Sequence, residues 1–140
     1  VQDTHFPHPQ LWFRFPTSAD TTWHTTLSPA MYYDAWMHFS VVSSVALSTR
    51  TVGVFANGVL LQTFTLQGEH TSFTETPLEL FSFSSTPFSA GLVQELRIWG
   101  IARSANDIAD SMNEQLYGSE PHLQALWPCD ECHGEELRDL

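Results

Sequence analysis

The chain has 140 residues, of which 42% are hydrophobic and 13% aromatic, and its formal net charge is −11. This length suits one domain with a sizeable core, the composition excludes a disordered chain, and no apolar run approaches the roughly 20 residues of a membrane span. Five Arg and no Lys stand against sixteen acidic residues, which excludes nucleic acid and anionic membranes as partners, because phosphate recognition needs clustered cations.

The first part of the chain predicts short strands. Residues 1–16 are typical of an extended, proline-rich N-terminal arm, which contains a strand at 11–15. The polar segment 17–26 is either a loop or an edge strand. Residues 36–45 are largely apolar, which predicts a strand covered on both faces.

The pair Asn57-Gly58 predicts a hairpin between strands at 51–56 and 59–64. Both residues tolerate positive φ, as a type I′ turn requires. The residues nearest the turn are expected to form three apolar cross-strand pairs, namely Ala56 with Val59, Phe55 with Leu60, and Val54 with Leu61.

One helix follows two further strands, which are expected at 77–83 and 92–99. Ser104 suits the N-cap of this helix, and Asp107 completes a capping box. Its apolar stripe is predicted to consist of Ile108, Met112 and Leu116, and Gly118 is predicted to take the C′ position. A last strand is expected at 123–127.

Four separated motifs occur in a recognisable order and spacing. Their residues are Trp36 and His38, then Asn57 and Gly58, then Glu95, Arg97 and Trp99 followed by Ser104, and finally Trp127, Pro128, Asp130 and Glu131. In these motifs the chain resembles the laminin-G-like, pentraxin-like branch of the concanavalin superfamily. The resemblance implies an all-β fold, an antiparallel two-sheet jelly-roll sandwich with one short helix near the C-terminus. It places the arm at 1–16, the sandwich at 11–128 and an acidic, cysteine-containing tail at 129–140.

The chain departs from this family in two ways. Only about one strand precedes Trp36, so the sandwich is expected to be N-terminally incomplete, with exposed sheet edges that invite pairing. The family places an Asp before Glu95, and this chain has the neutral Gln94, which is a poorer calcium ligand. We therefore expect no cofactor, with calcium as the alternative. The metal candidates are Gln94, Glu95, Asp130 and Glu131.

Cys129 and Cys132 bracket a short motif that ends in His133 and allows three interpretations. A disulfide between the cysteines, or to sequence elsewhere, fits an oxidising compartment and is favoured. The spacing also fits covalent haem attachment, although no second axial ligand is marked. Zinc bound by Cys129, Cys132 and His133, with His122 as a further ligand, is the third interpretation.

Catalysis is not expected. Glycosidases of this superfamily need two carboxylates that face each other across a cleft. The strands offer only isolated acids, Glu79 and Glu95, and Glu95 lies two residues from Arg97, which favours a structural ion pair. His38 is interpreted as a mid-strand core or interface residue.

Two functions agree with these features. The first is a non-catalytic extracellular structural module that associates with neighbouring copies or chains through sheet edges and terminal arms, as a homo-oligomer, polymer or fibre. The alternative is an adhesive or lectin-like module of the cell surface that binds glycans or proteins, with or without calcium. The 28 Ser and Thr residues suit strand surfaces and O-glycosylation.

Overall fold

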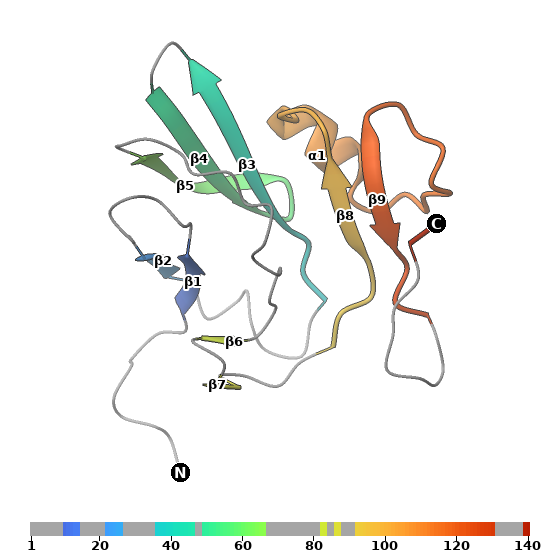
Figure 1. The fold of residues 1–140 in the computed structure, drawn as a ribbon, viewed down its shortest axis with the longest axis horizontal. Helices are drawn as coiled ribbons and strands as arrows, with labels where there is room; N and C mark the ends of the chain where they lie inside the picture. Colours follow the sequence, from blue (N-terminus) through green and yellow to red (C-terminus); the bar gives the residue numbers. More distant parts are fainter. Residues whose placement is uncertain are drawn as a thin grey trace. The chain divides into compact units, whose positions relative to one another are not determined.

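The protein is described by a computed structural model, and its chain divides into two compact units. The first comprises Val1–Ser72 and Ala102–Glu114, and the second comprises Phe73–Ile101 and Gln115–Leu140. Each unit is described separately below, and its elements are shown in Figure 1. The residues that the structure describes are 10–14, 22–26, 36–46, 49–66, 82–83, 86–87, 92–130 and 139–140.

The first unit begins with a two-stranded antiparallel ladder. Strand β1 (Gln10–Arg14) pairs with β2 (Thr22–Thr26), and Phe13 lies opposite Trp23. The strand expected at 11–15 is therefore confirmed with a shift of one residue, and the end of the polar segment 17–26 is a strand. The rest of the predicted arm lies outside the described residues.

A three-stranded antiparallel sheet forms the centre of the first unit. Strand β4 (Thr49–Ala56) lies between β3 (Phe39–Ala46) and β5 (Val59–Leu66). Val and Thr are the commonest residues of these strands, and their β-branched side chains fit a pleated surface. The side chains of Val52, Val54 and Ala56 on β4 are fully buried.

Strand β3 differs from its prediction in two respects. It begins at Phe39 and not at Trp36, and most of its side chains are exposed, so the expected cover on both faces is wrong. The faces of a strand are covered only where another layer packs on the sheet, and an apolar composition alone does not supply that layer. Among the described residues β3 also has a neighbouring strand on one side only. An apolar sequence therefore lies at the edge of this sheet, where the prediction assumed its interior.

The hairpin between β4 and β5 is confirmed. Asn57 and Gly58 have φ values of 48° and 77° and lie between the pairs Ala56 with Val59 and Phe55 with Leu60. The next expected pair is wrong. Val54 lies opposite Gln62 and not opposite Leu61, because the register shifts between Val54 and Phe55. One extra residue on β5 forms a β-bulge, which has no strong local sequence signal.

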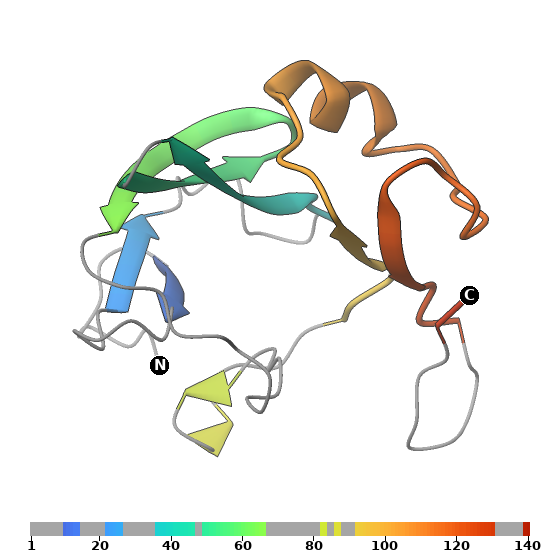
Figure 2. The ribbon, with the colours of Figure 1, turned by 45° about the horizontal axis from the view of Figure 1, so that its top comes forward.

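Helix α1 (Ala105–Ser111) also belongs to the first unit, and Figure 2 shows it at the turn of the β4–β5 hairpin. The predicted capping box between Ser104 and Asp107 is confirmed, and Ile108 is buried. The predicted length is wrong. The helix ends at Ser111, where the Glu114 N–H donates to the Ser111 carbonyl at 3.1 Å and tightens the final turn. Leu116 and Gly118 consequently lie beyond the helix, in the second unit.

The second unit contains two short antiparallel pairs. Strand β8 (Leu96–Trp99) pairs with β9 (Leu123–Trp127), and β6 (Ser82–Phe83) pairs with β7 (Thr86–Pro87). The prediction for 123–127 is confirmed, whereas the strand expected at 92–99 begins only at Leu96. Of the strand expected at 77–83, the last two residues form β6 and the others lie outside the described residues. Leu116 and Leu126 are the buried apolar side chains described here.

Antiparallel strands and one short helix thus make up the described part of the chain. This agrees with the expected all-β class. No helix in the described ranges is long and apolar enough to cross a membrane.

Candidate functional site

The first motif pair, around His38 and Asn57, forms a reciprocal hydrogen-bonded contact. The His38 N–H donates to Asn57 Oδ1 at 3.0 Å, and the Asn57 N–H donates to the His38 carbonyl at 2.8 Å. This contact fastens the start of β3 to the β4–β5 turn. His38 therefore precedes β3, which corrects its expected place in mid-strand. Its imidazole Nδ1 lies 3.4 Å from Ser40 Oγ.

The second residue of that turn is Gly58, and two features of the structure require a residue without a side chain there. A Cβ atom at Gly58 would lie 2.8 Å from the Cβ of Ala109 on helix α1, closer than such atoms approach in proteins. The residue meets a second condition as well, because its positive φ disfavours other residues. The motif Asn57-Gly58 therefore forms the turn, and the missing side chain of Gly58 leaves room for helix α1 to pack against it.

A network of hydrogen bonds surrounds the N-cap of α1. Asp107 Oδ2 accepts from the Ser104 N–H at 3.0 Å and from Ser104 Oγ at 2.7 Å, and these bonds, with the nearby charge of Arg103, lower the pKa of Asp107. Arg103 Nη1 donates to Ser111 Oγ at 2.8 Å, and Nη2 donates to the Asp107 carbonyl at 2.9 Å. The sequence indicated Ser104 and Asp107, but the part played by Ser111 has no local signal. The network stabilises the helix and brings no nucleophile to a base.

The expected ion pair between Glu95 and Arg97 is confirmed. Arg97 Nε donates to Glu95 Oε1, and both side chains are mostly buried. The carboxylate of Glu95, one of the calcium candidates, is thus paired with the guanidinium of Arg97. Gln94 and Asp130 are exposed, and Glu131 lies outside the described residues. Within the described ranges, no three His, Cys, Asp or Glu side chains come together as metal ligands do. Calcium binding stays a prediction.

Glu120 is a carboxylate that sequence reasoning missed. Its Oε1 accepts a hydrogen bond from the Tyr117 N–H at 2.7 Å, and this bond, assisted by the charge of Arg97, lowers the pKa of Glu120. Its Oε2 is buried without a hydrogen-bond partner. The bond to Tyr117 closes the loop that leads into β9. No periodic pattern marks Glu120, so the sequence offered no signal for it.

Of the cysteine motif, only Cys129 and Asp130 lie within the described residues. Cys129 has a φ of 56°, and its Sγ donates to the Trp127 carbonyl at 3.5 Å. Cys132 and His133 lie outside the described residues, so the disulfide, haem and zinc interpretations stay predictions. His122 is exposed, and its carbonyl accepts from the Gly100 N–H at 2.8 Å.

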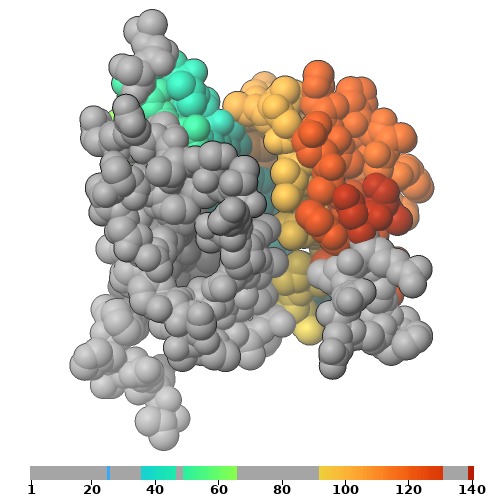
Figure 3. All heavy atoms as spheres, viewed as in Figure 1, coloured from blue at the N-terminus to red at the C-terminus, as the bar shows by residue number. Residues whose placement is uncertain are grey.

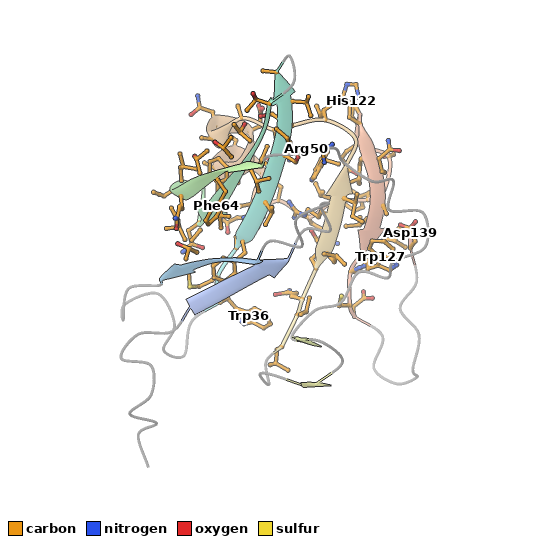
Figure 4. All side chains as sticks on the ribbon, turned by 60° about the vertical axis from the view of Figure 1, so that its left-hand side comes forward. Trp36, Arg50, Phe64, His122, Trp127 and Asp139 are labelled. Atoms are coloured by element: carbon orange, nitrogen blue, oxygen red, sulfur yellow. The ribbon has the colours of Figure 1, made fainter. Side chains whose placement is uncertain are left out.

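The end of the chain contacts β9 within the second unit. The Leu126 N–H donates to Asp139 Oδ1 at 2.7 Å, and the Leu140 N–H donates to the Leu126 carbonyl at 3.0 Å. Figure 3 shows the dark red atoms of residues 139–140 against the orange surface of this unit, and Figure 4 shows Asp139 beside β9 near Trp127. The acidic tail, expected as a separate segment, therefore has a docked end.

Large apolar side chains are exposed on the first unit. Trp36 is 63% exposed and Val45 is 60% exposed, at opposite ends of the β3 segment. Phe39 and Val41 of β3 are exposed as well, by 40% and 45%.

Comparison with known proteins gives one match. A laminin G family model, described as the concanavalin A-like lectin/glucanases superfamily, matches residues 3–109. Searches of curated proteins and of solved structures found no match. The matched residues include the turn motif, the Glu95–Arg97 pair and the N-terminal part of helix α1 with its cap.

Proposed function

The chain belongs to the concanavalin A-like lectin/glucanases superfamily, and we propose that it is a non-catalytic extracellular module that assembles with neighbouring copies of itself. Domains of the laminin G kind are commonly extracellular, which supports the location. The family fold also supports a two-sheet jelly-roll sandwich for the domain. The pairing of Glu95 with Arg97 supports a structural use of this carboxylate over a catalytic one.

Strand β3 carries the proposal of assembly. It lies at the edge of its sheet in the described part of the chain, and Phe39, Val41 and Val45 expose 40%, 45% and 60% of their surface. An edge strand offers backbone N–H and C=O groups for pairing with another chain, and natural proteins protect such edges with charges. β3 has only apolar and hydroxyl side chains. A second copy that pairs along it would bury both its backbone groups and these side chains.

Substitution of Val45 by Lys tests the proposal. A charge on the edge strand disfavours edge pairing, so sedimentation of Val45→Lys should show a lower weight-average mass than the wild type at equal concentration. The control is Asn113→Lys, which makes the same charge change at an exposed site after helix α1. A wild-type chain that stays monomeric up to high concentration would overturn the proposal.

Glycan binding is a second candidate, favoured by the exposure of Trp36. An indole that is 63% exposed can stack on a sugar ring. A glycan array, probed with and without calcium, should lose its signal for Trp36→Ala if this face binds sugar. Equal signals for wild type and Trp36→Ala would exclude this face as the binding site.

A further inference from the structure

The outer edge of β9 is occupied by residues 139–140 of the same chain. Leu126 directs its N–H to Asp139 and its carbonyl to Leu140. Both backbone groups of one strand residue point to the same side of the strand. Because the N–H and carbonyl of Leu126 bond to Asp139 and Leu140, these two groups point away from Arg97 of β8, which lies opposite Leu126, and Asp139–Leu140 covers the other edge of β9.

Gly118 holds the other side of this contact. Its φ is +84°, and a Cβ atom built there would lie 3.0 Å from the Leu140 carbonyl oxygen. The main chain of Leu140 thus passes between β9 and Gly118. Two hydrogen bonds to Leu126 and the close approach to Gly118 together place the two residues.

We infer that Asp139–Leu140 is a latch on the edge of β9, and that its release opens this edge to the same segment of a second copy. A carboxylate that accepts from a backbone N–H forms a charge-assisted bond, stronger than a neutral one. An opened edge binds extended segments through main-chain hydrogen bonds. Every copy carries the matching Asp-Leu pair, so a second copy is a suitable partner. This second step rests on the proposed assembly function.

Hydrogen exchange of the Leu126 amide tests the latch. In Asp139→Ala this amide should exchange roughly ten- to a hundredfold faster than in the wild type, which is the loss expected for a hydrogen bond to a charged group. Asp139→Asn keeps an oxygen acceptor and should retain most of the protection. The control Asp110→Ala removes an exposed carboxylate on α1 and should leave the rate unchanged. Unchanged exchange in Asp139→Ala would overturn the latch.

A mixing experiment tests the second copy. Isotope-labelled Asp139→Ala has an open edge, and an excess of unlabelled wild-type chain should restore protection at its Leu126 amide. Unlabelled Asp139→Ala cannot supply the carboxylate and should restore none. If the wild type also restores no protection, the proposal that a second copy supplies the segment is wrong, even though the latch within one chain stands. Assembly through β3 is measured separately with Val45→Lys, so its failure is distinguishable from either result.

Discussion

Gly58 is the residue on which two parts of the first unit depend. Its φ of +77° suits the turn, and the lack of a Cβ admits Ala109. The effect on stability of adding one methyl group at Gly58 can therefore be predicted from its contact with Ala109.

We expect Gly58→Ala to lower the free energy of unfolding by about 2–4 kcal/mol, which combines the cost of a left-handed backbone with that of overpacking. Urea denaturation measures this loss. In the double variant Gly58→Ala/Ala109→Gly the steric part should be relieved, so the two changes should be non-additive. Additive effects would show that helix α1 does not press on the turn.

Asp107 makes the stability of helix α1 depend on pH. Its ordinary pKa of 3.8 is lowered in the fold by the bonds from Ser104. Folding therefore favours the ionised form, and the stabilisation is complete above the unfolded pKa and lost as the pH falls through the folded pKa. Asp107→Ala should be less stable than the wild type at pH 7, and thermal unfolding should show this difference shrinking below pH 3.8. A constant difference between Asp107→Ala and the wild type across this pH range would contradict the assignment.

At the scale of elements, β4 holds the sheet together because it alone has two described neighbours in it. Val54 is fully buried on this strand, whereas Val45 on β3 is 60% exposed. The same substitution should therefore have different effects on the two strands.

We expect Val54→Ala to destabilise the fold by about 2–3 kcal/mol, through lost burial and the cavity left behind. Val45→Ala should cost less than about 0.5 kcal/mol. Chemical denaturation of both variants checks the ratio. Equal losses would mean that β3 is covered in the folded chain.

Elements also show where prediction from sequence succeeded. The turn at Asn57-Gly58 and the capping box at Ser104 depend on contacts between residues one to three positions apart, which the sequence displays directly. The bulge at Leu61 and the end of α1 at Ser111 depend on strand twist and on Glu114 bonding back to Ser111, and neither has a periodic signature. Of the candidate site residues, the Glu95–Arg97 pair was predictable because opposite charges stand two positions apart in the sequence, although Glu95 itself directly precedes β8.

For the whole molecule, the net charge of −11 opposes the association of copies. Salt screens this repulsion, because the Debye length falls from about 30 Å at 0.01 M to about 8 Å at 0.15 M. Sedimentation should therefore show a rising weight-average mass as NaCl is added at constant protein concentration. A falling mass would indicate that opposite charges, and not apolar edges, join the copies.

The sequence by itself determined the acidity, the strand-rich class, the hairpin turn and the helix cap, because each follows from composition or from neighbours along the chain. Only the tertiary structure decided that apolar β3 has a single neighbouring strand among the described residues and that Asp139 reaches Leu126 across thirteen positions. Such contacts join segments whose separation no local pattern encodes, since they form only when strands have paired and turned the chain back on itself.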